Sequence, residues 1–234
     1  MISRYPSRYF AHLDVLRLLF VVSLDVLGKR FEDFIKGCGL FPGSADSSRS
    51  PTSPFDIEAR FDREHGLPTS IKTTGSNIVT LADARRFFAS PGPYRMLVGR
   101  YRQVGERKEF HEVHEFILSE RAIDELKGEL SVEDVTAFHE GLLLPRFPKG
   151  MHAQARSWAD ERLSELRSRR SRVVLNRKID SDTQRRLQCS LNLRDLVAVS
   201  TEFGEYHLHT DQIGSVILPI IQASPRRVFK PRPA

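Results

Sequence analysis

Cysteine is scarce in this 234-residue chain, and long apolar runs and a glycine-rich phosphate loop are missing. Cys38 and Cys189 are too few and too far apart for a disulfide framework or a thiolate metal cage, so we expect a reducing compartment. The most apolar N-terminal run, residues 18–24, is far shorter than the roughly 20 residues that span a bilayer. These absences predict a cytoplasmic protein that does not cross a membrane.

Positive charge is concentrated in one segment. The chain has 36 Lys and Arg against 30 Asp and Glu, a formal net charge of +6. Residues 146–194 hold 13 of the basic and 5 of the acidic side chains, so this segment carries +8 and the remainder carries −2. An arginine-rich stretch of one sign is typical of a surface that binds nucleic acid, although a solvated basic helix face accounts for it equally well.

Hydrophobic periodicity predicts an α/β protein with a central mixed β-sheet flanked by helices. Helical spacing is found at 10–36, with Ser23 as a cap, from Thr80 to Pro91, after Ser119, after Ser131 and at 152–170. Alternating or apolar strand patterns are found at 55–62, 69–74, 94–103, 110–118 and across most of 173–219. We expect one domain over residues 1–234, with a catalytic core at about 24–118 and a basic half at about 146–222.

Four features occur in a characteristic order within the first hundred residues. A helix with Gly28 and Glu32 comes first, a strand beginning Pro54-Phe55-Asp56 comes second, a strand with Ser70-Ile71-Lys72 comes third, and a helix and an apolar strand follow. This order resembles the core of the PD-(D/E)xK phosphodiesterase superfamily, which includes many restriction endonucleases. The resemblance covers residues 24–103 and implies a restriction-endonuclease-like core, Mg²⁺ as cofactor and double-stranded DNA as substrate.

The chemistry of phosphodiester cleavage explains why these residue types occur together. The reaction needs a nucleophilic water near neutral pH and positive charge at the phosphoryl oxygens, and Mg²⁺ bound by oxygen ligands supplies both. Residues two apart on a strand share a face, so Asp56 is expected to point with Glu58, and Ser70 with Lys72. If the two strands form a hairpin, two carboxylates and one ammonium converge on one patch.

The expected site consists of the catalytic residues Glu32, Asp56, Glu58, Ser70 and Lys72. Asp56 is the predicted principal metal ligand, with the carbonyl of Ile71, Glu58 and Glu32 as further ligands. Lys72 is expected to orient or deprotonate the attacking water and to stabilise developing charge.

Ser70 departs from the family pattern, which has an acid two residues before the lysine. Glu58 is the natural substitute by strand geometry and Asp83 a weaker one, because Asp83 lies three residues after Thr80 and suits a capping box. If neither acid reaches the metal, the protein binds nucleic acid without cutting it. Each residue also has an ordinary reading: Glu32 as a helix-surface ion pair, Asp56 and Glu58 as a wet strand face, and Lys72 as edge protection.

Candidate nucleic-acid contacts form two groups. Bidentate pairing with base edges is a property of Arg and Gln side chains, whereas a dense basic stretch positions a protein on phosphates. The candidates are Arg100, Arg102, Gln103, Arg169, Arg170, Arg172, Lys178, Arg185, Arg186 and Gln188. Salt bridges on a sheet surface are an equally good explanation for any one of these arginines.

The leading hypothesis is a Mg²⁺-dependent DNA endonuclease of restriction-enzyme type, plausibly a homodimer, since two active sites cut both strands of a symmetric target. Two other classes stay open: a non-catalytic nucleic-acid-binding protein on the same fold, and a protein-interaction module whose basic segment meets an acidic partner. A zinc site at His111-Glu112-Val113-His114 is set aside, because that motif needs histidines four apart on a helix.

Overall fold

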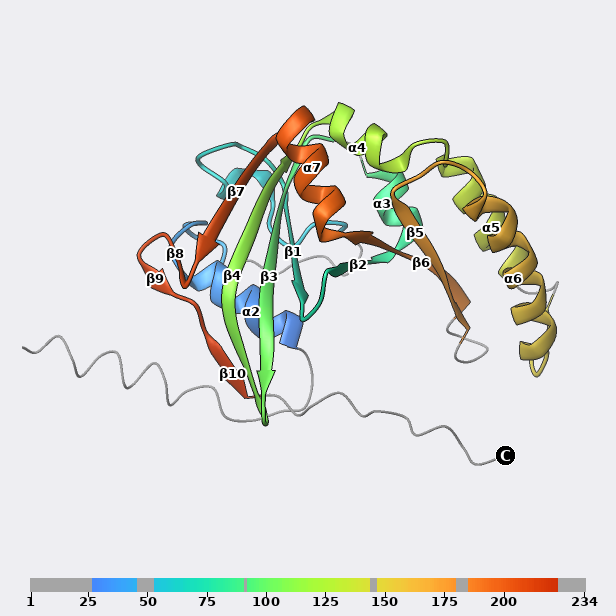
Figure 1. The fold of residues 1–234 in the computed structure, drawn as a ribbon, viewed down its shortest axis with the longest axis horizontal. Helices are drawn as coiled ribbons and strands as arrows, with labels where there is room; N and C mark the ends of the chain where they lie inside the picture. Colours follow the sequence, from blue (N-terminus) through green and yellow to red (C-terminus); the bar gives the residue numbers. More distant parts are fainter. Residues whose placement is uncertain (1–26, 46–52, 91, 144–146, 180–184, 223–234) are drawn as a thin grey trace, which may run out of the picture.

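The computed structural model describes residues 27–45, 53–90, 92–143, 147–179 and 185–222 (Figure 1). Its helices are α2 (Leu27–Gly37), the 3-10 helix η1 (Ala59–Phe61), α3 (Ala84–Ala89), α4 (Glu120–Lys127), α5 (Val132–Leu142), α6 (His152–Arg167) and α7 (Leu193–Phe203). Its strands are β1 (Thr69–Thr74), β2 (Ile78–Asp83), β3 (Tyr94–Val104), β4 (Arg107–Leu118), β5 (Val173–Ile179), β6 (Arg185–Asn192), β7 (Glu205–Thr210), β8 (Gln212–Ile213), β9 (Val216–Ile217) and β10 (Ile220–Gln222).

The main sheet has five strands and is mixed. Its order is β1-β3-β4-β10, and β7 also pairs with β4. β1 runs parallel to β3, whereas β4 is antiparallel to its three neighbours β3, β7 and β10. A second, antiparallel sheet has the order β2-β6-β5, and β8 and β9 form a small hairpin. A mixed sheet flanked by helices is therefore confirmed.

Helices cover both faces of the main sheet. α2 places Phe31 in a core with Leu97 and Val113, whereas α7 places Leu196 in a separate core with Phe116. Figure 1 shows α2 and α7 on opposite sides of β3 and β4. Side chains alternate between faces along a strand, so neighbouring residues of β3 and β4 serve different cores.

Gly99 allows α2 to approach β3 closely. A Cβ atom at this position would lie 2.4 Å from the ring of Phe31, which is fully buried. The Phe31 ring also stacks on Phe110 of β4 with 4.4 Å between ring centroids. Glycine is needed here because any side chain would push the helix away from the sheet.

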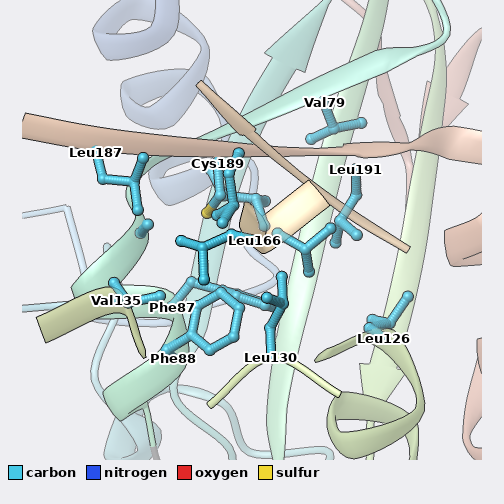
Figure 2. Packing of buried hydrophobic residues seen from close by; sticks show 14 of the residues in the cluster. Val79, Phe87, Phe88, Leu126, Leu130, Val135, Leu166, Leu187, Cys189 and Leu191 are labelled. Atoms are coloured by element: carbon cyan, nitrogen blue, oxygen red, sulfur yellow. The ribbon is translucent and has the colours of Figure 1, made fainter. Parts of the chain in front are cut away.

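The second sheet packs against α3, α5 and α6. Figure 2 shows part of this core, where Cys189 and Leu187 of β6 face Val135 of α5, Leu166 of α6 and Phe87 of α3. The same core continues to the α7 face of the main sheet, so the two sheets share one apolar interior.

Several elements expected from the sequence are confirmed. β3 and β4 form the predicted hairpin around Gly105, which has a φ of 57°. Ser119 caps α4 by accepting a hydrogen bond from the Ala122 amide, and Ser131 opens α5 with a complete capping box. The predicted basic helix corresponds to α6. Of the helix expected at 10–36, only the part from Leu27 lies within the described residues, and Ser23 lies outside them.

The strand and hairpin predicted at 55–62 are wrong. Only Ile57 forms an isolated antiparallel bridge, with Thr69, and the chain then enters η1. Asp62, the residue after η1, fixes the following turn, because its buried carboxylate accepts hydrogen bonds from the amides of Glu64 and His65 and pairs with Arg95. β1 therefore takes β3 as its parallel strand partner.

Two helix boundaries also differ from expectation. The segment after Thr80 continues as β2, and α3 begins only at Ala84, with Asp83 as its N-cap. α7 was read as part of a β region, although Asn192 caps it through a hydrogen bond from the Arg194 amide. Within the described residues, no helix is long and apolar enough to cross a membrane.

Candidate functional site

Asp56 lies at the open edge of β1. Its amide donates to the Thr69 carbonyl at 2.9 Å, and its Oδ2 accepts from the Ile71 amide at 2.7 Å. The amide and carbonyl of one strand residue point to the same side, so Ile71 presents both groups to the edge opposite β3. The Asp56 carboxylate therefore binds the strand edge where the short bridge at Ile57 ends.

Lys72 brings a positive charge to the same point. Its Nζ lies 3.5 Å from Asp56 Oδ2 and 3.2 Å from the Ile71 carbonyl oxygen, and Ser70 Oγ lies 3.5 Å from Asp56 Oδ2. The Asp56 side chain is 9% exposed and that of Lys72 is 21% exposed. Two oxygens of the chain thus converge on one cationic centre in a partly desolvated position.

Strand geometry explains why these groups meet. Ser70 and Lys72 pair with Met96 and Val98 of β3, so they lie on one face of the main sheet, the face covered by α7. That part of the sequence expectation is confirmed. The long Lys72 side chain reaches back over its own strand edge to Asp56, which comes from outside the sheet.

Glu32 lies on α2, which packs against β1. Its Oε1 is 2.8 Å from Lys36 Nζ and 3.3 Å from Lys29 Nζ, and Glu32 and Lys36 are both buried. These are the intrahelical ion pairs that the ordinary reading of Glu32 anticipates. Lys29 and Lys36 therefore fix the position of the Glu32 carboxylate on α2.

Glu58 does not share a face with Asp56 as predicted. It precedes η1, its side chain is 57% exposed, and its Oε2 pairs with Arg60 at 3.1 Å. The prediction is wrong because it rested on strand alternation at 55–62, and that segment leaves the sheet after Ile57. Glu58 is therefore a surface residue.

Asp83 is a half-buried residue of the second sheet. It ends β2, accepts a hydrogen bond from the Arg85 amide at 2.9 Å, and has a side chain that is 17% exposed. Burial raises the pKa of the neighbouring Cys189 thiol to about 12, with Asp83 adding to the increase and Lys72 opposing it. The same buried thiol thus feels both the Asp83 carboxylate and the Lys72 ammonium.

The oxygen atoms of Asp56 and Ile71 are of the kind that Mg²⁺ binds in proteins. The described residues contain no group of three or more His, Cys, Asp or Glu side chains that could hold a metal ion. Mg²⁺, however, is usually bound through one or two carboxylates, waters and substrate phosphates, without an all-protein cage. The Asp56 carboxylate and the Ile71 carbonyl converge on a position that a cation, the Lys72 ammonium, already occupies. This oxygen pair fits a Mg²⁺ site completed by substrate.

The candidate contacts on β3 differ from one another. Arg100 is held by Glu112 at 3.1 Å and by Asn77 at 3.3 Å, and its side chain is 34% exposed. Arg102 is 69% exposed beside Glu109, and Gln103 donates to the carbonyl of Gly105 in the turn. Arg100 is therefore oriented by its neighbours, whereas Arg102 and Gln103 belong to the hairpin end.

The basic segment is partly engaged within the fold. Arg169 pairs with Asp134 at 2.6 Å, and Arg172 pairs with Asp195 at 3.3 Å. Arg185 is buried and donates to the carbonyl of Phe147, so it does not contact base edges as expected. The reason is strand alternation, which turns position 185 toward the core.

Three other candidates share a partly exposed face of the second sheet. Arg186 and Gln188 alternate with buried residues of β6, as predicted, and Lys178 of β5 pairs with Arg186 in the strand register. Arg170 is exposed just after α6. The first three residues are therefore half-buried, and Arg170 is exposed.

The sequence did not predict a buried cluster of charged residues around Arg95. The Arg95 guanidinium contacts Asp62 at 3.1 Å and also pairs with Glu115, and the Oε2 of Glu115 is 2.7 Å from His209 Nε2. Burial alone would raise the pKa of Glu115, but the hydrogen bond from His209 and the charge of Arg95 outweigh it and lower the pKa. No local signal marks these positions, because the partners come from four separate segments.

Comparisons with protein-family models, with curated proteins and with solved structures yield no match to this chain.

Proposed function

We propose that the protein is a Mg²⁺-dependent DNA endonuclease of restriction-enzyme type, with a restriction-endonuclease-like core. The observation that supports it is the convergence of the Asp56 carboxylate, the Ile71 carbonyl and the Lys72 ammonium at the edge of β1. A carboxylate and a carbonyl that meet beside a lysine supply the ligands and the charge that phosphodiester hydrolysis requires.

Each residue of the site has a distinct role in this proposal. Asp56 Oδ2 and the Ile71 carbonyl would hold Mg²⁺, which provides positive charge and lowers the pKa of a bound water. Lys72 moves from its contact with both oxygens toward the attacking water and the scissile phosphate. Ser70 donates to Asp56 Oδ2 and helps to orient its carboxylate.

Asp83 is the acid that we assign in place of the family's acid at position 70. Glu58 is at the surface, whereas Asp83 shares the electrostatic environment of Cys189 with Lys72. Asp83 acts through a water because it already caps α3. Glu32 lies on the helix that packs against β1, but its carboxylate is paired with Lys29 and Lys36, so we assign it no direct role.

The substrate in this proposal is double-stranded DNA, and Arg170, Lys178, Arg186 and Gln188 are its candidate contacts beyond the site. A homodimer is the expected assembly, because paired sites cut both strands of a symmetric target. We place the protein in the cytoplasm, where that substrate is found in cells without a nucleus.

The proposal is tested with supercoiled plasmid, incubated with the full chain in Mg²⁺ or in EDTA. We expect nicked and linear products with Mg²⁺ and intact plasmid in EDTA, because the two chain oxygens cannot activate water without the cation. Asp83→Asn should lower the cutting rate and Glu58→Gln should leave it unchanged. Gel electrophoresis of the products over time measures both effects.

Two outcomes would reject the nuclease proposal and favour the other classes. Retention of plasmid in both conditions with no nicking at high protein concentration indicates a non-catalytic nucleic-acid-binding protein. No affinity for DNA or RNA even at low salt indicates a protein-interaction module, since phosphate binding weakens steeply as salt rises and is strongest when salt is low.

A further inference from the structure

A polar cluster on β3 and β4 lies outside the Asp56 and Lys72 site. Glu112 Oε2 is 3.1 Å from Arg100 Nη1 and 3.3 Å from His114 Nε2, and His114 Nδ1 is 3.0 Å from the hydroxyl of Tyr206. Asn77, in the turn between β1 and β2, accepts from the other terminal nitrogen of Arg100 at 3.3 Å. Arg100 is thus fixed from two sides.

This cluster shares a sheet face with Lys72. Lys72 pairs with Val98, and Arg100 is two residues further along β3, so both side chains leave the sheet on the same side. From the strand spacing and the rise per residue, their Cα atoms lie about 8 Å apart. Two long basic side chains at this separation can reach neighbouring phosphates of one DNA strand.

The exposure of the cluster decreases from Arg100 inward. The Arg100 side chain is 34% exposed, that of Glu112 is 25% exposed, and that of His114 is 8% exposed. A guanidinium has five N–H donors, and the partners described for Arg100 engage its two terminal nitrogens. The outward part of Arg100 can therefore bind an anion while Glu112 and Asn77 keep it in place.

One arginine and two histidines surround the Glu112 carboxylate. Arg100, His114 and His111 all lie near its carboxylate, with His111 Nε2 at 3.9 Å. Burial opposes ionisation of Glu112, but Arg100 and the two histidines outweigh it and lower its pKa. Burial lowers the pKa of His114, which Glu112 only partly offsets. Near neutral pH the charges of this cluster are therefore mainly those of the Arg100 guanidinium and the Glu112 carboxylate.

We propose that Arg100 forms a second phosphate subsite, which binds the DNA phosphate next to the one at Lys72. Glu112 and Asn77 are positioning residues for its guanidinium. This inference rests on the proposed nuclease function and adds the path of the DNA strand, which runs from the edge of β1 across β3. It also separates Arg100 from Arg102 and Gln103, which the sequence grouped together.

The test is a binding titration with a fluorescently labelled DNA duplex in EDTA, so that affinity is measured apart from cleavage. Arg100→Ala should weaken binding roughly 5- to 30-fold, the effect of losing one charged hydrogen-bonded contact. The log–log salt dependence should become shallower by about 0.9, because one fewer phosphate is neutralised. Arg121→Ala, which removes an exposed arginine on α4, should change neither quantity, and Arg100→Lys should restore part of the affinity.

Glu112→Gln distinguishes a phosphate subsite from a purely structural ion pair. The amide keeps a hydrogen bond to Arg100 but removes negative charge near the bound phosphate, so affinity should increase roughly 2- to 5-fold. If the Arg100–Glu112 pair only stabilises the local structure, both Arg100→Ala and Glu112→Gln should weaken DNA binding. If the wild type binds and cuts DNA while Arg100→Ala retains its affinity and salt dependence, the subsite is wrong and the nuclease proposal stands. If the wild type binds no DNA, both are wrong.

Discussion

Lys72→Met is expected to reduce the rate of plasmid cleavage roughly 10²- to 10⁴-fold, the usual contribution of a positioned proton-transfer group. The wild-type ammonium is within 3.5 Å of both the Asp56 carboxylate and the Ile71 carbonyl. Met has a similar length without charge, so the packing over β1 is largely kept. Without Mg²⁺ the Lys72 ammonium stays beside the Asp56 carboxylate and the Ile71 carbonyl, so affinity for duplex DNA in EDTA should change little.

The control for this prediction is Lys127→Met. Lys127 is also partly buried, and its Nζ also donates to a main-chain carbonyl, that of Phe88, at 3.0 Å, but it lies on α4. Its substitution should leave cleavage unchanged. Cleavage by Lys72→Met at the wild-type rate would refute the catalytic role of Lys72. Loss of both binding and cleavage in a folded variant would instead make Lys72 a binding residue, and the denaturation midpoint shows whether the variant is folded.

Arg95→Met is expected to lower the free energy of unfolding by about 3–5 kcal/mol, the cost of breaking a buried ion pair by removing one partner. The Arg95 side chain is 3% exposed, and its carboxylate partners Asp62 and Glu115 are 0% and 6% exposed. Removing the guanidinium leaves both buried acidic groups without their arginine partner. Urea denaturation of the wild type and the variant measures the difference.

The pH dependence of this loss identifies its cause. Without Arg95, the pKa of Glu115 rises because burial is no longer opposed by the guanidinium, so protonation of Glu115 reduces the loss of stability as pH falls. The difference from wild type should therefore be smaller at pH 5 than at pH 8. A difference that is constant with pH would point to lost packing on Phe41, whose ring centroid lies 5.1 Å from the Arg95 guanidinium carbon. Arg102→Met, a 69% exposed arginine on the same strand, should have little effect on stability.

Several basic residues of the segment 146–194 form contacts within the fold. Arg169 and Arg172 pair with acids on α5, α4 and α7, and Arg167 donates to the Leu175 carbonyl, so they join α6 and the following turn to the rest of the fold. Part of the charge excess is therefore used in structure. The remaining candidates, such as Arg186 and Lys178, lie on one face of the β5 and β6 pair.

The sequence correctly predicted those helices and hairpins whose turns and caps involve residues close together in the chain. The β3 and β4 hairpin follows from two apolar strands around Gly105, and α4 and α5 follow from their capping serines. The segment 55–62 has the same alternation as a strand, yet it leaves the sheet after Ile57, and its last residue, Asp62, pairs with Arg95, 33 positions later. α7 lies within the region predicted as strands, because it follows β6 directly and only the Asn192 cap separates the two elements.

The sequence by itself determined that Asp56, Ser70 and Lys72 are the residues to examine, because their types and order are readable along the chain. Only the tertiary structure decided that Glu58 does not share a face with Asp56. Glu58 is two positions from Asp56 but points to solvent with Arg60, whereas Asp83 ends a strand of the other sheet and shares the surroundings of Cys189 with Lys72. Spacing along a strand determines which of its side chains share a face. Which side chains of different strands come into contact depends on how the strands pair. The parallel pairing of β1 with β3 joins residues that are distant in sequence, so the sequence pattern alone does not predict it.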